Sequence, residues 1–282
     1  MPAFDTPKPI SATVTIEVGT LRIVAGDRTD TVVDVRPSSA SRDADVRAAE
    51  RTRVEYSHGK LLVKGPKERS LFGKGSSVDV DIALPAGSEV RATSTMGHIT
   101  AEGALGESEF KTSAGDVQVE RVAGVRATTG FGDVRIGYAD GAAHAATGSG
   151  EIRLGEIRGG AVAKNSNGPV GFGDIGGDVT VKTSNGSVTV DRAAADVSVK
   201  TACGSIQVGE LVHGTTELET AAGKIDVGIR EGTAAWLDVR TGGGVVRQSL
   251  EKAGTSQAPA DATDTLKLRA RSGFGDITVH RA

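Results

Sequence analysis

Several residue types that build functional sites or thick cores are scarce in this chain of 282 residues. The single cysteine, Cys203, excludes an intramolecular disulfide. Five histidines are scattered singly, and none has metal-ligand spacing with another. Aromatic residues make up only 3% of the sequence, which does not fit a thick globular core. We therefore expect no metal site and no cofactor.

The chain also lacks a strong charge of one sign and any long apolar run. The formal net charge is −3 with mixed signs, which gives no electrostatic case for nucleic-acid binding. No segment reaches about 18 consecutive apolar residues, the rough length of a membrane span, so we expect no integral membrane segment. The first residues show no basic start followed by an apolar run, which predicts no signal peptide and a cytoplasmic location.

A short repeated unit dominates the sequence from Val90 onward. In each unit, apolar residues alternate with other residues on both sides of one glycine, most clearly around Gly186 and Gly204. The ten glycines are Gly97, Gly115, Gly132, Gly150, Gly168, Gly186, Gly204, Gly223, Gly244 and Gly275. They lie 17 to 21 residues apart, except for a last gap of 31. A fixed short period marks a stacked architecture, so we predict an all-β parallel β-solenoid of about ten coils with about 18 residues per coil.

Fixed positions around each glycine define two short strands and a corner. The residues two positions after the glycine are all β-branched and apolar, and those four positions after are apolar except Gln248. Alternation with period two predicts half-buried strands. Three positions before each glycine stands Ser, Thr or Asn, which we expect to satisfy backbone groups at the turn. The alternative is an array of hydroxyl groups on the outer face that binds a regularly repeating ligand surface. It is disfavoured, because these side chains point to the same side of the strand as the inward apolar residues.

Residues 1–89 do not show the repeated unit, and we predict a β-rich N-terminal region that caps the first coil. Candidate strands cover 12–18, 21–25, 31–36, 52–56, 60–64 and 77–84, and residues 42–50 form a short helix or a loop. Gly19-Thr20 and His58-Gly59 are predicted hairpin turns. The repeat region is 90–282, and its polar segment 249–264 is a predicted loop inserted before the last coil, 265–279.

The repeated Thr-x-x-Gly-x-Val-x-Val units resemble those of the DUF4097 family, bacterial β-strand-repeat proteins often described as adhesins. Gly-Phe-Gly-Asp recurs at 130–133, 171–174 and 273–276, and the run Val-Asp-Ile-Ala-Leu-Pro-Ala-Gly-Ser at 80–88 belongs to the same resemblance. The resemblance covers nearly the whole chain. It implies a right-handed single-stranded β-helix, and it carries over no catalytic residues.

Stacked coils would turn repeated positions into columns of side chains. One such column is acidic, with Asp116, Asp133 and Glu151 directly after their glycines, and Arg135 and Arg153 stand two positions further on. Carboxylates on adjacent coils could perform general acid/base work or bind calcium. The simpler interpretation is an exposed face of acid–arginine pairs, each worth well under about 1 kcal/mol.

Two further candidates are basic. Lys164, Lys182 and Lys200 stand four positions before three consecutive glycines, and Glu219 continues this column and is a predicted partner of Lys200. Such a strip could receive an acidic protein surface, or it is simply a solvated face. The segment 64–77 places basic residues around the apolar pair Leu71 and Phe72, which could touch an anionic membrane surface or a partner groove. The simpler interpretation of this segment is a hairpin loop.

Three classes of function remain open on the sequence alone. The first choice is a non-catalytic scaffold or adhesin-like interaction protein with a protein partner, because the repeat dominates and no catalytic constellation stands out. A carbohydrate-active β-helix enzyme is second and depends on the acidic column. A polymer-forming solenoid of the bactofilin kind is third, because an uncapped coil could meet another copy. The oligomeric state does not follow from the sequence.

Overall fold

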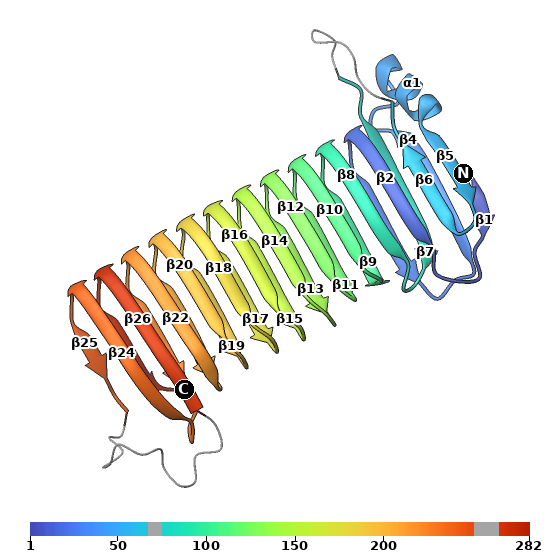
Figure 1. Ribbon diagram of the computed structural model, residues 1–282. Coiled ribbons are helices and arrows are strands. Elements are labelled where there is room, and N and C mark those ends of the chain that lie inside the picture. The colour runs from blue at the N-terminus through green and yellow to red at the C-terminus, as the bar shows by residue number, and fades with distance from the viewer. Residues whose placement is uncertain (67–74, 251–264) are drawn as a thin grey trace. The chain divides into compact units, whose positions relative to one another are not determined.

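The computed structural model describes residues 1–66, 75–250 and 265–282. The chain divides into two compact units, residues 1–140 and 141–282. Strands make up nearly all of the regular structure in both units, and the described residues contain one helix, α1 (Asp43–Arg51). Figure 1 shows the strands of each unit stacked side by side.

In the first unit, each repeat contributes one strand to each of two sheets. One sheet stacks β8 (Glu89–Met96), β10 (Ser108–Ala114) and β12 (Val125–Phe131), and the other stacks β9 (Ile99–Leu105), β11 (Val117–Val122) and β13 (Val134–Ala139). All of these pairings are parallel, and the residues two positions after the glycines, such as Val117 and Val134, lie in register. Two strands and two turns therefore form one coil, as the repeat predicted.

The second unit repeats this arrangement over more coils. One sheet contains β14 (Ala143–Ser149), β16 (Ala161–Asn167), β18 (Val179–Asn185), β20 (Val197–Cys203), β22 (Gly214–Ala222), β24 (Ala234–Gly243) and β26 (Thr265–Phe274). The other contains β15 (Ile152–Ile157), β17 (Val170–Ile175), β19 (Val188–Ala193), β21 (Ile206–Leu211), β23 (Ile225–Ile229), β25 (Val246–Gln248) and β27 (Ile277–Arg281). Val188 and Ile206 are partners on adjacent parallel strands. The predicted all-β parallel β-helix is confirmed.

The order of the last two coils differs from their order in the sequence. β26 pairs with β22 on one side and with β24 on the other, and β27 lies in the same way between β23 and β25. The C-terminal coil is thus inserted before the coil of β24 and β25, which ends the stack. The expectation that residues 265–279 form the outermost coil is wrong, because glycine spacing gives the length of a connection but not where the chain returns.

The N-terminal region contains coils of its own. β2 (Ser11–Val18) pairs in parallel with β8, and β3 (Leu21–Gly26) pairs in parallel with β9. β6 (Lys60–Lys64) and β7 (Val78–Pro85) follow on the other side of this coil, also in parallel. Gly19-Thr20 is therefore a corner between two sheets, and the predicted hairpin there is wrong. The unit around Gly19 was missed because Ile16 replaces the usual Ser, Thr or Asn three positions before the glycine.

Antiparallel strands and the helix complete the N-terminal region. β4 (Asp30–Pro37) pairs with β7 and with β1 (Ala3–Asp5), and β5 (Arg53–Ser57) pairs with β6. The β5–β6 connection is the predicted hairpin at His58-Gly59, with positive φ of 49° and 74° at these two residues. Helix α1 packs on β4 and β7. The division of the chain into a cap region 1–89 and a repeat region 90–282 stays a prediction.

Glycine is required at the corner of each coil because neighbouring backbones touch there. A Cβ placed on Gly168 would lie 2.2 Å from the carbonyl oxygen of Gly150, and one on Gly204 would lie 2.0 Å from that of Gly186. Gly168 also has a φ of +129°, which side-chain-bearing residues rarely adopt. The same contact joins Gly275 to Gly223 and Gly244 to Gly275, which matches the inserted coil.

The core is thin and consists of rows of apolar side chains that the two sheets point toward each other. The residues two and four positions after the glycines, and five positions before them, are buried in nearly every coil. The coil of β24 and β25 is the exception, because Val239 is half-buried and Val246 and Gln248 are exposed. Gln248, the one polar residue at its position of the repeat, thus lies on the terminal coil, where its side chain is exposed to solvent.

We predict that Gly168→Ala lowers the free energy of unfolding by more than about 2 kcal/mol, because the added methyl group meets the Gly150 carbonyl and the backbone is strained. Gly171→Ala is the matched control, since a Cβ there meets no atom within 4 Å. Chemical denaturation of both variants provides the comparison. Equal stability of the two variants would contradict the backbone contact at the corner.

Candidate functional site

The small polar side chains three positions before the glycines are structural. Thr129 donates to the carbonyl oxygen of Gly115 at 2.9 Å, and Thr220 donates to that of Gly204 at 3.0 Å. Ser272 does the same to Gly223 at 2.9 Å. These three hydroxyls are buried and satisfy backbone acceptors at the corner. The buried hydroxyls of Ser94, Thr183 and Thr201, in contrast, have no hydrogen-bond partner among the described residues.

The first residue of the predicted acidic column also stabilises the corner. Asp116 Oδ1 accepts a hydrogen bond from the backbone N–H of Asp133 at 2.9 Å. His98, one coil earlier, accepts from the backbone N–H of Asp116 through Nδ1 at 3.2 Å. A side chain directly after the glycine thus caps the turn of the next coil, which gives these residues a structural task.

The predicted acid–arginine pairs form within single strands. Arg135 donates to Asp133 Oδ2 at 2.8 Å, and in the second unit Arg153 donates to Glu151 Oε1 at 3.1 Å. All four side chains are at least partly exposed, so solvent screens both pairs and each contributes little. Within the described ranges, no group of three His, Cys, Asp or Glu residues is placed to hold a metal ion.

The same corner contact carries a pH dependence at the outermost coil. Asp276 Oδ1 accepts from the backbone N–H of Val245 at 2.9 Å, and Oδ2 accepts from Arg247 at 2.8 Å. The hydrogen bond from Arg247, followed by that from Val245, lowers the pKa of Asp276. A lowered pKa in the folded state means that this stabilisation is complete above the pKa of the unfolded chain and is lost as pH falls through the folded pKa.

We therefore predict that acidification loosens the coil of β24 and β25 before the central coils. Amide hydrogen exchange at Val245 should accelerate as pH falls below the ordinary aspartate pKa, after correction for the intrinsic rate. Asp276→Ala, which removes the acceptor, should show fast exchange at neutral pH already and lose the pH dependence. Unchanged protection of Val245 in this variant would contradict the assignment.

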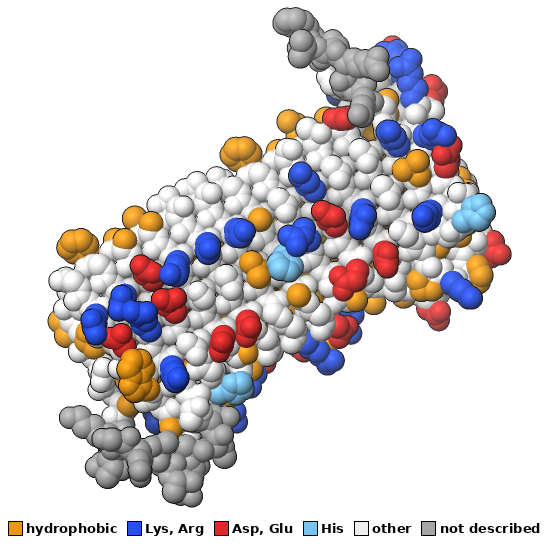
Figure 2. Space-filling model, in the orientation of Figure 1, with side chains coloured by type: hydrophobic (Ala, Val, Ile, Leu, Met, Phe, Trp, Pro, Cys, Tyr) orange, Lys and Arg blue, Asp and Glu red, His pale blue; other side chains and the backbone are white. Residues whose placement is uncertain are grey.

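The lysine row, Lys164, Lys182 and Lys200, is the clearest charged feature of the second unit. Register places Lys164 beside Lys182 and Lys182 beside Lys200 on β16, β18 and β20. Adjacent strands lie about 4.8 Å apart, and all three side chains are exposed. Figure 2 shows Lys and Arg side chains following one another across this sheet. The column predicted from the sequence therefore exists as a continuous strip.

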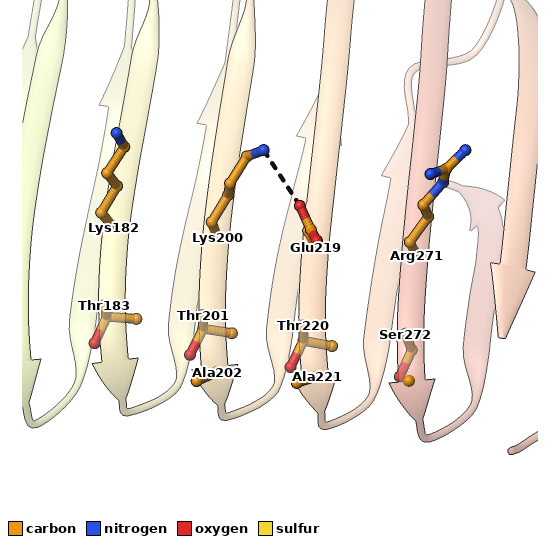
Figure 3. Close-up of a pocket in the computed structure, with 11 residues that line it drawn as sticks. Lys182, Thr183, Lys200, Thr201, Ala202, Glu219, Thr220, Ala221, Arg271 and Ser272 are labelled. Atoms are coloured by element: carbon orange, nitrogen blue, oxygen red, sulfur yellow. Dashed lines mark ion pairs between the residues drawn. The ribbon is translucent and has the colours of Figure 1, made fainter. Parts of the chain in front are cut away.

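The two ends of the lysine row differ in charge compensation. Lys200 Nζ lies 3.2 Å from Glu219 and 3.7 Å from Glu217, as Figure 3 shows for the first of these pairs. The hydrogen bond with Glu219 and the charges of both glutamates raise the pKa of Lys200. The predicted Lys200–Glu219 pair is thus confirmed. Among the residues that the structure describes, Lys164 and Lys182 have no acidic partner within ion-pair distance.

A shallow depression of about 580 Å³ runs alongside the lysine row. Lys182, Lys200, Glu219 and Arg271 line one side of it (Figure 3). Outward-pointing residues two positions before the glycines are small here, namely Ala202, Ala221 and Gly273, which leaves the space open. Sequence reasoning found the charges but missed the depression, because it comes from missing side-chain volume on three strands that the inserted coil brings together.

The remaining candidate, the apolar pair predicted to touch a membrane or a partner groove, is not tested by the structure. Leu71 and Phe72 lie outside the described residues. No helix in the described parts of the chain is both long and apolar enough to cross a membrane.

Comparison with known proteins gives distant structural similarity. No protein-family model matches the sequence, and no curated protein matches it at a significant level. A proposed adhesin from Parabacteroides merdae is 16% identical, with 79% of this chain and 93% of that chain covered and a TM-score of 0.42. A proposed adhesin from Bacteroides fragilis is 10% identical over 99% of this chain and 95% of that chain, with a TM-score of 0.39.

A proposed cell adhesion protein from Clostridium sporogenes is 11% identical over 100% of this chain and 98% of that chain, with a TM-score of 0.25. Similarity at this level identifies no function for this chain. The residues and geometry described above define a parallel β-helix with a charged strip on one sheet, and the functional argument rests on them.

Proposed function

We propose that this chain is a non-catalytic scaffold or interaction protein that binds an acidic protein segment along the lysine row. Membership of the DUF4097 family, an adhesin-like role and a cytoplasmic location belong to the same proposal. The observation that carries it is the in-register stack of Lys164, Lys182 and Lys200, of which the first two lack an acidic partner among the described residues.

Charge repulsion within the row favours an acidic partner. Like charges directly opposite on neighbouring strands are destabilising, and Glu217 and Glu219 relieve this repulsion only at Lys200. A carboxylate-rich segment that runs across β16 and β18 would relieve it at Lys164 and Lys182. Rim charges of this kind raise the association rate and the specificity more than the affinity.

The depression borders Lys182 and Lys200 and extends over β20, β22 and β26, so it gives such a segment room at this end of the row. Its floor of Ala202, Ala221 and Gly273 lets an extended backbone approach the sheet closely. The carboxylates of the acidic column, in contrast, are engaged in corner capping and in arginine pairs, which makes them poor general acids or bases. This contrast favours binding over the carbohydrate-active alternative.

We predict that a fluorescently labelled polyglutamate peptide binds the full chain at low ionic strength and dissociates as salt rises. Lys182→Glu should weaken this binding about tenfold, because it places a carboxylate in the centre of the row. Fluorescence anisotropy measures the affinity.

Lys111→Glu is the matched control for Lys182→Glu. Lys111 occupies the same position of the repeat on β10, but its neighbours in register are Thr93 and Thr128, so it stands alone. Its replacement makes the same change in net charge and should leave the affinity within about twofold. Equal losses in the two variants would show that only net charge matters, and the docking surface would be abandoned.

A further inference from the structure

Among the described residues, the outermost coil of the second unit ends in a long strand that is paired along one edge only. β24 is 10 residues long and pairs with β26 on one side only, among the strands that the structure describes. Its core-facing Leu237, Val239 and Thr241 are half-buried, whereas their counterparts Leu268, Ala270 and Ser272 on β26 are buried. One row of backbone groups and the end of the apolar core therefore face outward together.

The devices that normally protect such an edge are missing from β24. Native edges are blunted by proline, lysine, bulges, inward-pointing charges or short strands. β24 contains no proline and no lysine, and its pairing with β26 runs without a register shift. Its two charged residues, Asp238 and Arg240, have opposite signs and lie on the outer face of the sheet. An edge of this kind is a template for another strand.

We propose that a second copy of this chain occupies this edge, with β24 paired antiparallel to β24 of the partner about a two-fold axis at Val239. A two-fold axis normal to the sheet keeps the core-facing side chains of both copies on the same side. Side chains alternate between the two faces along a strand, so two facing residues share a face only if both residue numbers are odd or both are even. An axis at Val239 meets this condition. Asp238 of each copy then faces Arg240 of the other copy, which gives two such pairs per dimer.

The sequence of β24 is self-complementary in this register. Arg240 is the partner best placed to bridge, because its side chain is 73% exposed while it contacts Asp238 at 2.9 Å within its own strand. Asp238 is 19% exposed and also lies 3.7 Å from both Arg269 and Arg271 on β26, so the bridge from the second copy adds to existing pairs. Opposite charges directly across an antiparallel pair are stabilising. Trp236, which is 62% exposed, falls opposite Gly242, where an aromatic ring covers an otherwise bare edge glycine.

The neighbouring registers are less favourable. An axis at Asp238 would set the two Asp238 carboxylates against each other, and an axis at Arg240 would do the same to the two guanidinium groups. On the core side, the Val239 register sets Val239 against Val239 and Leu237 against Thr241. The half-buried apolar residues of both copies thereby cover one another.

The experiment is sedimentation equilibrium of the full chain from micromolar to near-millimolar concentrations, together with tryptophan fluorescence. Trp236 is the single tryptophan of the sequence, so its emission reports on this edge alone. We expect a reversible monomer–dimer equilibrium, with an emission maximum that shifts to shorter wavelength as the dimer forms. A chain that stays monomeric, or a dimer without this shift, would overturn the proposal.

Charge variants test the register. Asp238→Arg and Arg240→Asp each place like charges opposite one another and should weaken dimerisation about tenfold or more. The double variant that carries both changes restores opposite pairs between the copies and should dimerise more tightly than either single variant. It does not restore the pairs of Asp238 with Arg269 and Arg271 within one chain, so the comparison is with the single variants.

Asp191→Arg, an exposed residue on β19, is the control for charge reversal elsewhere and should leave dimerisation unchanged. Circular dichroism and thermal unfolding establish that the variants are folded. Single variants that dimerise like the natural chain, or a folded double variant that fails to recover, would exclude pairing through β24 in this register.

Discussion

The close approach of backbones at the glycine corner is the constraint on which the rest of this structure depends. At Gly186, a single added carbon would lie 2.0 Å from the carbonyl oxygen of Gly168. That carbonyl belongs to the coil before, so each corner fixes the height of the next coil. Hydroxyl groups such as that of Thr129 then bind the glycine carbonyl of the preceding coil and hold the corner from inside.

A fixed corner turns sequence positions into rows on the surface. Because every coil starts from the same point, a residue at a given distance from the glycine lies above its counterpart in the coil below. Lys164, Lys182 and Lys200 become a strip for this reason, although 18 residues separate each from the next. Charged or polar surfaces in such a fold therefore form as columns of equivalent positions on successive coils. The role of a surface residue has to be judged together with its neighbours on the adjacent coils.

Much of this architecture could be predicted because the repeat encodes it directly. The alternation around each glycine predicted the strands and the buried files, and the Lys200–Glu219 pair followed from their shared position. The coil at Gly19 was missed, since Ile16 removes the polar residue that marks the corner elsewhere. Ile16 still points inward and is buried. The coil therefore forms with an apolar residue at this position, although the repeat pattern has Ser, Thr or Asn there.

The order of coils and the corner capping could not be predicted from spacing. A gap of 31 residues between Gly244 and Gly275 is compatible with either order of the last two coils. In the structure β26 lies between β22 and β24, and the coil of β24 ends the stack. Likewise, nothing in the sequence distinguishes an acidic side chain that accepts a backbone N–H, as Asp116 does, from one that faces a substrate.

Disulfide cross-linking of neighbouring coils tests this account most directly. In a Cys203→Ser background, Glu219→Cys with Arg271→Cys should form a disulfide readily, because positions 219 and 271 are partners on adjacent strands. Glu219→Cys with Arg240→Cys should not, because β26 lies between them and the two Cα atoms are then beyond the roughly 7 Å limit for a disulfide. Cross-linking of the second pair but not the first would contradict the inserted coil and the stack of corners built on it.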